Sequence, residues 1–460
     1  MSRLSHTALW AITLLVSALL LCTVGFINGG PIVYPDTALY IADGERVLHF
    51  TAPLAVRPVF YGVAIFFLHW GLTVWPILIA QGLVVAHIIW LTYRVVGASL
   101  RPLPFVALMI LLALFTPLSW HTSHVLPDIF AGVLILALFL LGFCRHRLGR
   151  LETAYLFLLS AASICFHLTN LVVALGLCCA ILAVWAFWRP LRTVTRPVLA
   201  AGPIALALLA FFSLSLIVYQ RLTLTPNSPP HLMARLIMDG PGRDYLRAVC
   251  PTATLTICKY QDQIPDGYEP FLWVFMNQVP VADGKQIRAE EGAVVRGTVT
   301  MFPFAVAWHM LANTATQLVT LESKTDFPPP SWAALDAGGG MLARDVRGSL
   351  QSRGLLDGDA LDPLNFVHAV VALVSFVACL LLIRSCFASR LYWPAGLVLW
   401  ALLGMLANAF AGGALSGPFG RYQGRIIWLL PMAAAAAAIA LARSRPPLMV
   451  PAARARERVT

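Results

Sequence analysis

The sequence predicts an all-α polytopic membrane protein with about ten transmembrane helices, an outer juxtamembrane region and a long extracytoplasmic segment. Of the 460 residues, 59% are hydrophobic and 12% are charged, whereas about 25% of the residues of a soluble domain are charged. Apolar stretches of about 20 residues recur, and a helix needs this length to cross a bilayer. Lys and Arg gather in the short loops between the stretches. Together these observations exclude a soluble multi-domain protein.

The formal net charge of +11 has the sign expected for a nucleic-acid-binding protein. The arginines lie in short loops beside apolar stretches, however, where basic residues set membrane orientation. We therefore expect membrane lipids and no nucleic acid among the partners. An even number of spans places both termini, including a basic tail at 443–460, on the cytoplasmic side of a bacterial inner membrane. The N-terminal apolar run lacks a clear small-x-small cleavage site, which favours a signal anchor.

Residues 1–219 form the predicted N-terminal transmembrane module. Its first span covers residues 8–26, and a catalytic outer region follows at 28–70. Within that region, residues 58–70 are apolar and rich in aromatic residues but, at roughly 13 residues, too short to cross a bilayer. We expect them to form a helix in the membrane interface. The other complete spans of this module are predicted at 72–95, 103–118, 129–143 and 198–219.

The apolar stretch at 153–188 is too long for one span. Its roughly 36 residues would make a helix of roughly 54 Å, at 1.5 Å per residue. A single crossing would also place basic loops on opposite sides of the membrane, which the positive-inside rule disfavours. The sequence therefore predicts two helices that meet near His167 and Asn170.

Residues 220–365 form a long extracytoplasmic segment of mixed polarity, and residues 366–442 form the C-terminal transmembrane helices. Three spans are predicted in the latter, at 366–383, 391–410 and 426–441. Within the segment, residues 301–321 are apolar, but charged neighbours argue against a span, so we expect a soluble or surface-lying helix. Cys250 and Cys258 lie on the oxidising side in this topology, which favours a structural disulfide, and their spacing fits no standard zinc motif.

The predicted topology brings polar residues from distant parts of the chain to the outer face. Ionisable groups beside a bilayer are costly and so indicate function. The first loop contributes Asp36, Tyr40, Asp43, Glu45 and Arg57. Later loops contribute His121, His124, Asp128, His167, Arg421, Tyr422 and Arg425.

Three of these residues, Asp36, Asp43 and Asp128, are candidate catalytic carboxylates. A carboxylate such as Asp36 takes the proton from an acceptor hydroxyl as a general base. Each residue also has a structural interpretation: Asp36 and Asp128 both follow a proline and suit helix capping, whereas Asp43 suits a solvated loop. Asp36 is the preferred base.

Arg57, Arg421 and Arg425 are candidate ligands of a donor phosphate. Arginine binds phosphate bidentately and stabilises a leaving phosphate as its charge develops. Arg421 and Arg425 stand out because basic residues are depleted on the outer side. Their alternative role is to anchor the protein to lipid headgroups.

The remaining candidates are assigned to substrate binding. They are Tyr40, Glu45, His121, His124, His167 and Tyr422. A divalent metal on His121 and His124, with Asp128 nearby, is an alternative, although a His-x-x-His spacing alone does not indicate a metal site. The cofactor is therefore unassigned. Two of these candidates also have structural interpretations: Glu45 suits a solvated loop, and His167 suits a structural role in a helical hairpin.

This layout resembles the GT-C superfamily of membrane glycosyltransferases, which use polyprenyl-phosphate-linked sugars as donors. The resemblance rests on a first helix followed by an outer loop with Tyr34-Pro35-Asp36-Thr37-Ala-Leu-Tyr40, and on the long segment in the C-terminal half. It implies that Asp36 is the catalytic base. Many members carry adjacent acidic residues in this loop, whereas here Asp36 is isolated and Asp43 and Glu45 stand apart.

The sequence thus predicts an inverting glycosyltransferase that moves a sugar from a polyprenyl-phosphate donor to a glycan, lipid or protein acceptor on the periplasmic face. Two other classes remain open. A transporter or lipid flippase would need polar or broken helices at mid-membrane. A scaffold protein would have a shallow outer face with no cavity near Asp36.

Overall fold

The computed structural model describes residues 3–322, 340–356 and 361–444, so the predicted tail beyond Ser444 lies outside the described residues. Helices make up the secondary structure of these ranges, and they contain no β-strand. The only β-type pairing in them is an isolated bridge between Ile32 and His124. The predicted all-α class is confirmed.

The N-terminal half forms most of a helical bundle. Its helices are α1 (Arg3–Leu21), α2 (Thr23–Asn28), α3 (Pro35–Leu48), α4 (Phe60–His69), α5 (Trp75–Val96), α6 (Pro102–Phe115), α7 (Leu118–Ser123), η1 (Pro127–Ile129), α8 (Phe130–Phe143), η2 (Arg145–Arg147), α9 (Arg150–Phe166), α10 (Leu168–Phe187), η3 (Arg189–Leu191) and α11 (Pro197–Tyr219). Helix α8 is buried along nearly its whole length, because other helices surround it on every side.

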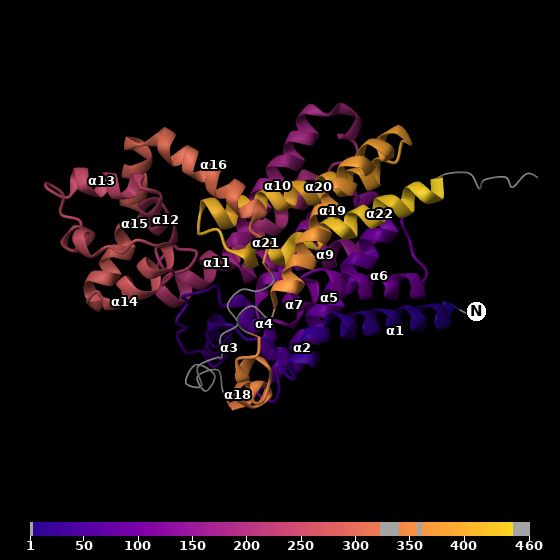
Figure 1. The fold of residues 1–460 in the computed structure, drawn as a ribbon, viewed down its shortest axis with the longest axis horizontal. Helices are drawn as coiled ribbons and strands as arrows, with labels where there is room; N and C mark the ends of the chain where they lie inside the picture. The colour runs from indigo at the N-terminus through magenta and orange to yellow at the C-terminus, as the bar shows by residue number, and fades with distance from the viewer. Residues whose placement is uncertain (1–2, 323–339, 357–360, 445–460) are drawn as a thin grey trace, which may run out of the picture.

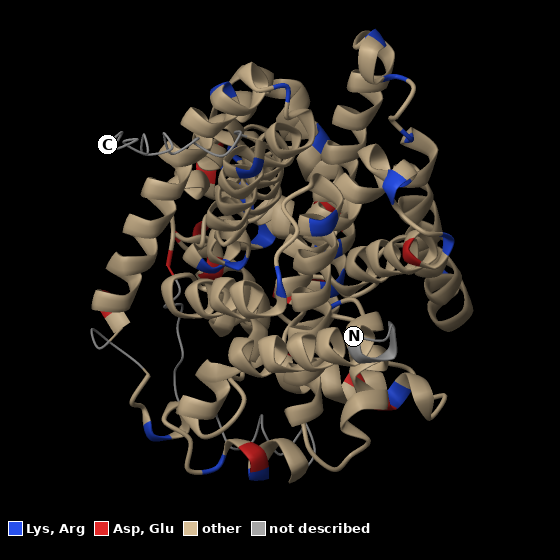
Figure 2. Ribbon diagram, turned by 90° about the vertical axis from the view of Figure 1, so that its right-hand side faces the viewer, with Lys and Arg blue, Asp and Glu red and all other residues tan. Residues whose placement is uncertain are grey.

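The C-terminal helices complete the bundle. They are α18 (Gly340–Val346), η6 (Gln351–Arg353), α19 (Asp362–Ala388), α20 (Tyr392–Ala409), η8 (Phe410–Ala414), α21 (Gly420–Ile427) and α22 (Leu429–Ser444). Figure 1 shows that α1 begins and α22 ends at the same end of the bundle. Charged residues are sparse on the bundle ribbon in Figure 2, as the composition requires.

A second group of helices, which we call the helical unit, projects from the opposite end of the bundle (Figure 1). It contains α12 (His231–Asp239), α13 (Pro241–Val249), η4 (Thr256–Gln263), η5 (Pro270–Phe275), α14 (Met276–Gln278) and α15 (Val281–Met301). It has its own apolar core, which includes Met233, Ile257, Phe271 and Ile287. Cys250 and Cys258 form a disulfide within it. Helix α16 (Pro303–Val319) joins the unit to the bundle.

Six helical segments are long and apolar enough to cross a membrane, within the described part of the chain. They are Trp75–Val96, Leu168–Phe187, Pro197–Tyr219, Asp362–Ala388, Tyr392–Ala414 and Gly420–Ser444. The pair α15 and α16 also passes together but is bent by 106°. Shorter apolar helices occur at His6–Leu21, Phe60–His69, Pro102–Phe115 and Pro127–Phe143. The fold therefore has the multi-pass character that the composition predicts.

Residues 153–188 are divided as the sequence predicts. Helix α9 ends at Phe166 and α10 begins at Leu168. His167 is the N-cap of α10, and its Nδ1 accepts a hydrogen bond of 3.2 Å from the backbone N–H of Thr169. Asn170 donates back to the carbonyl of Ser163 at 2.7 Å. These bonds replace the helical bonds that the break removes.

The expectation of a loop at 28–57 is wrong in part, because α3 occupies nearly half of it. Pro35 opens α3 and Asp36 lies in its first turn, and both positions favour a helix start. The hydroxyl of Thr37 accepts a 3.0 Å bond from the N–H of Tyr34. Helix α3 also packs closely on α4, since a Cβ added at Gly62 would lie 2.0 Å from the carbonyl oxygen of Tyr40. Hydropathy predicts neither the start of α3 at Pro35 nor its close packing on α4 at Gly62.

Candidate active site

Two loops at the helical-unit end of the bundle are joined by backbone hydrogen bonds. Ile32 donates to the carbonyl of Ser123 at 3.0 Å, and Val125 donates to the carbonyl of Ile32 at 3.0 Å. The Thr37 hydroxyl adds a 3.1 Å bond to the carbonyl of Val125. The start of α3 is thereby fixed beside the segment that leads to Asp128.

Asp36 forms an ion pair with Arg57, at 3.2 Å between Oδ2 and Nη2. Both side chains are mostly buried. Burial acts to lower the pKa of Arg57, but the charge of Asp36, together with Tyr40 and Tyr422, raises it above its usual value. Arg57 therefore stays charged at the candidate site.

Asp128 and Arg425 form the centre of a closed network. Arg425 Nη1 donates to Asp128 Oδ1 at 3.0 Å, its Nε and Nη2 donate to Asn408 Oδ1 at 3.1 and 2.7 Å, and Nη2 also donates to the Thr169 hydroxyl at 3.0 Å. The side chain of Arg425 is 0% exposed and that of Asp128 is 3% exposed. Burial acts to raise the pKa of Asp128, but Arg421 and Arg425 hold it below its ordinary value.

Arg421 links this network to the start of α3. Its guanidinium lies 4.2 Å from the ring centroid of Tyr34 and 5.6 Å from that of Tyr422. Its Nε is 3.8 Å from Asp128 Oδ2, which is too long for a hydrogen bond. Its Nη1 is buried with no hydrogen-bond partner among the described residues. Unlike Arg425, Arg421 keeps donor capacity for a ligand.

His121 and His124 lie buried beside Asp128, with ring centroids 5.4 Å apart in an edge-to-face arrangement. Burial lowers the pKa of both rings, that of His121 well below its ordinary value and that of His124 to about 4. Both are therefore neutral at neutral pH. No group of three or more His, Cys, Asp or Glu side chains in the described ranges is arranged to hold a metal ion.

Asp43 and Glu45 lie on α3, two turns or more beyond Asp36. Asp43 is buried, and its carboxylate accepts hydrogen bonds from the N–H groups of Leu54 and Ala55 at 2.7 and 2.9 Å. Arg46 pairs with it at 3.3 Å. Asp43 thus fixes the backbone that leads to Arg57, and it is not the solvated loop charge of the alternative interpretation. Glu45 is half-buried.

A cavity of about 1040 Å³ lies between the bundle and the helical unit. Four of the predicted site residues line it, namely Tyr40, Arg57, His167 and Tyr422. Its apolar wall comes from α10 and from the region around η8, and includes Leu171, Val172 and Leu415. Asp36 does not belong to the lining, but it forms its ion pair with Arg57, which does. Such a cavity between two packed units is where ligand sites commonly occur.

Five ionisable residues that sequence reasoning missed also line the cavity: Arg221, His231, Lys285, Arg288 and Glu291. They lie in a segment whose place beside the bundle is set only by tertiary packing. One local signal exists, because Lys285 shares one face of α15 with Ala282 and Ala289, at a helical spacing. Burial lowers the pKa of His231 to about 3, so its ring is neutral.

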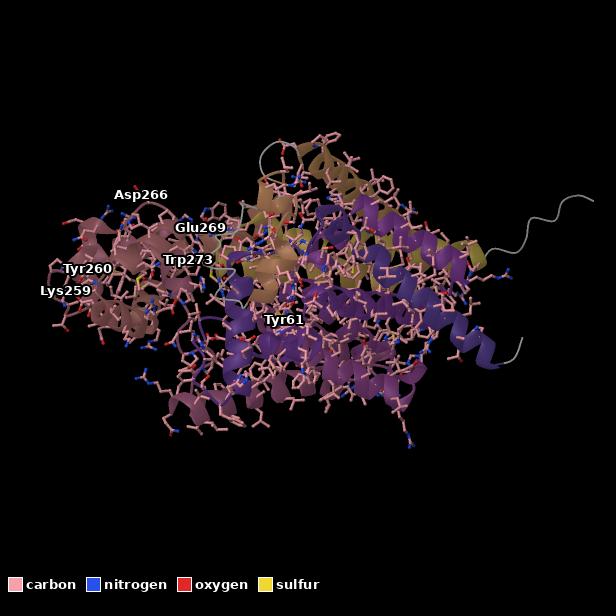
Figure 3. The ribbon with its side chains drawn as sticks, turned by 90° about the horizontal axis from the view of Figure 1, so that it is seen from below. Tyr61, Lys259, Tyr260, Asp266, Glu269 and Trp273 are labelled. Atoms are coloured by element: carbon pink, nitrogen blue, oxygen red, sulfur yellow. A yellow bond between two sulfur atoms is a disulfide. The ribbon has the colours of Figure 1, made fainter. Side chains whose placement is uncertain are left out.

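The helical unit meets the candidate site through Trp273. The guanidinium of Arg57 lies 5.6 Å from the ring centroid of Trp273. Figure 3 shows Trp273 and Glu269 on the edge of the unit that faces the bundle, whereas Lys259 and Tyr260 lie at its far end and Tyr61 lies within the bundle. A cation held over an indole ring, in a partly buried place, is attracted to it. The unit therefore helps to position Arg57.

His167 presents a neutral ring at the cavity. Burial lowers its pKa to about 3, and Nδ1 accepts from Thr169, so Nε2 carries the proton. Tyr268 links the two sides of the cavity wall, because its hydroxyl bonds His231 Nδ1 at 2.7 Å and the Ser416 hydroxyl at 2.8 Å. The cavity thus offers cationic, neutral hydrogen-bonding and apolar surfaces side by side.

Comparisons of this chain with protein-family models, with curated proteins and with solved structures find no match.

Proposed function

We propose that this protein is a membrane glycosyltransferase that transfers a sugar from a polyprenyl-phosphate-linked donor to an acceptor. The observation that carries the proposal is the cavity beside the Asp36–Arg57 pair, with an apolar wall from membrane-type helices and a cationic wall. A lipid phosphate has the same division between a hydrocarbon chain and an anion. Polar side chains such as Thr225 and Asn227 complete the lining and suit the hydroxyls of a sugar.

The proposed chemistry is a single displacement that inverts the anomeric carbon. The acceptor hydroxyl oxygen attacks this carbon while the bond from the carbon to the phosphate oxygen breaks. The Asp36 carboxylate takes the hydroxyl proton, and the polyprenyl phosphate leaves with the bonding electron pair. Arg57, which contacts Asp36 and lines the cavity, stabilises the negative charge that develops on the phosphate.

The three arginines have different roles in this proposal. Arg57 binds the donor phosphate directly, and Arg421 assists through the nitrogen that has no partner in the described ranges. Arg425 holds Asp128 and Asn408 and positions α21 rather than binding the ligand, because its donors are already engaged. Tyr40, His167 and Tyr422 contact the substrate.

We propose ten spans for the membrane topology. Each of the ten segments that the sequence predicts as spans overlaps a helix, and the shorter ones cross as part of the packed bundle. Helices α1 and α22 have their outer ends on one side, away from the cavity, which supports termini that share the cytoplasmic side of a bacterial inner membrane. The cavity and the helical unit then face the periplasm.

The test is a transfer assay with the purified full chain in nanodiscs. A panel of undecaprenyl-phosphate-linked hexoses and pentoses is supplied with an envelope glycan extract, and release of undecaprenyl phosphate is measured by mass spectrometry. Asp36→Asn is expected to lower the rate by about 100- to 10,000-fold, because a general base contributes about this much.

Asp266→Asn is the control, since it makes the same chemical change at an exposed position in the helical unit. It is expected to retain the full rate. Turnover by a folded Asp36→Asn variant at the rate of the unmodified protein would rule out Asp36 as the base. Absence of transfer from every donor, with uptake of the lipid into vesicles instead, would replace the enzyme by a transporter or flippase.

A further inference from the structure

The cavity contains more positive charge than one donor phosphate uses. Its lining includes Arg57, Arg221, Lys285 and Arg288, and Glu291 is its only acidic residue among the described residues. Arg57 is already paired with Asp36. The other three cations form no ion pair with a carboxylate in the described ranges.

Glu291 offsets only one of these positive charges. Its Oε1 accepts hydrogen bonds from the N–H groups of Leu232 and Met233 at 3.1 and 3.2 Å, at the start of α12. Its carboxylate is therefore used to cap a helix of the unit. Arg288, three residues earlier on α15, has a buried Nε with no hydrogen-bond partner among the described residues. A buried N–H without a partner is costly unless a ligand completes it.

Two of the three cations, Lys285 and Arg288, belong to the helical unit, whereas Arg221 follows the bundle helix α11. Lys285 and Arg288 lie on α15, whose opposite face is buried in the core of the unit through Ile287 and Val294. Arg221 lies in the segment that joins α11 to α12. Arg57 and the apolar wall belong to the bundle. The cavity therefore has two cationic places that belong to different bodies of the protein.

We infer that Arg221, Lys285 and Arg288 form a second anion subsite, and that it binds a phosphate or carboxylate group on the acceptor saccharide. The inference rests on the proposed function, because it assigns the donor phosphate to Arg57. Polar residues of the same lining, among them Thr225, Ser228 and Gln286, then face the neutral part of the sugars. An acceptor with a charged group would be oriented by that group while its hydroxyl lies toward Asp36.

The test uses binding as well as transfer. The full chain in nanodiscs of phosphatidylcholine is titrated with glucose 6-phosphate, glucuronic acid and glucose, and separately with undecaprenyl phosphate, by microscale thermophoresis. The two anionic sugars are expected to bind more tightly than glucose, with an affinity that falls as salt is added. The double substitution Lys285→Gln with Arg288→Gln is expected to weaken glucose 6-phosphate by roughly ten- to a hundredfold, as loss of hydrogen bonds to a charged group does.

Arg296→Gln is the matched control, because it removes the same charge from the same helix outside the cavity lining. It is expected to leave every affinity unchanged. Lys285→Glu provides a second variant at an exposed position, where folding is not at risk, and is expected to abolish binding of glucose 6-phosphate. Undecaprenyl phosphate should keep its affinity for the double variant and lose it with Arg57→Gln.

The outcomes separate this inference from the proposed function. Equal affinity of glucose 6-phosphate for the double variant and for the unmodified protein would overturn the inference, whether or not transfer occurs. An equal loss for undecaprenyl phosphate and glucose 6-phosphate would assign the cations to the donor and also overturn it. Selective loss of anionic sugars supports the subsite even if no transfer is found, in which case the proposed function alone fails.

Discussion

The Asp128–Arg425 network and the cationic side of the cavity use similar residues in opposite ways. In the network, the donors of Arg425 are engaged by Asp128, Asn408 and Thr169, and the side chain is fully buried. In the cavity, Lys285 and Arg288 have no ion-pair partner within the described chain and line an open volume. A charged residue near a membrane thus indicates function only when its hydrogen-bonding capacity is left unfilled.

This difference changes the role of one predicted phosphate ligand. Arg421 and Arg425 are alike in the sequence, because they lie four residues apart in one short helix. In the fold, the donors of Arg425 form hydrogen bonds, whereas a nitrogen of Arg421 has no partner among the described residues. The network therefore holds the bundle helices together, whereas Lys285 and Arg288 of the cavity form no ion pair in the described ranges.

The largest expected effect comes from breaking the closed network. Asp128→Asn keeps the shape of the side chain but removes the charge beside Arg425. Leaving a buried charge without its partner typically costs about 3–5 kcal/mol. We expect a loss of this size in the free energy of unfolding, measured by denaturant titration in mixed micelles. The ion pair between Asp266 and Arg243 gives the control, because the side chain of Asp266 is 98% exposed. Asp266→Asn should change stability by less than about 1 kcal/mol, and equal effects at both positions would contradict the comparison.

A smaller effect is expected from acid. Burial lowers the pKa of His124 to about 4 in the folded state, whereas an unfolded histidine has a pKa of about 6.5. The unfolded state then binds more protons, so the stabilisation is fully present above about pH 6.5 and is lost as the pH falls toward 4. Between pH 7.5 and 5 this is roughly 2 kcal/mol. Thermal unfolding at the two pH values should show a smaller difference for His124→Gln than for the exposed His49→Gln. An identical difference in both variants would show that His124 does not titrate as described.

The smallest effect on stability is expected for the cationic residues of the cavity. The double substitution Lys285→Gln with Arg288→Gln removes charges that have no ion-pair partner in the described ranges. We expect the free energy of unfolding to change by less than about 0.5 kcal/mol, as for surface substitutions generally. The same denaturant titration measures it. A loss comparable to that of Asp128→Asn would mean that these cations support the fold rather than a ligand.

Much of the architecture could be predicted from local sequence. Apolar stretches gave the helices of the bundle, and the excess length of residues 153–188 gave the break that the structure places at His167. The polar candidates Asp36, Arg57, Asp128 and Arg421 could be found because charge is rare beside apolar stretches. The resemblance to glycosyltransferases supports the role of Asp36 as general base, which stays a prediction.

The cationic side of the cavity could not be predicted in the same way. Residues 220–300 are of mixed polarity, so charged residues such as Lys285 and Arg288 do not stand out in that part of the sequence. Their position follows from the core of the helical unit, around Ile287 and Phe271, which turns one face of α15 toward the bundle. The structural role of Asp43 could not be predicted for the same reason, since its partners at Leu54 and Ala55 meet it only after the chain folds back.

The sequence by itself determined which segments are helical and apolar, and where charge interrupts them, because hydropathy and helical period are properties of neighbouring residues. Tertiary structure alone decided which charges are satisfied. Arg425 meets Asp128 across nearly three hundred residues of chain, as the separation of 297 positions shows. Whether the N–H groups of a guanidinium find hydrogen-bond partners depends on such distant contacts. This physical difference separates the scaffold of the protein from its candidate site.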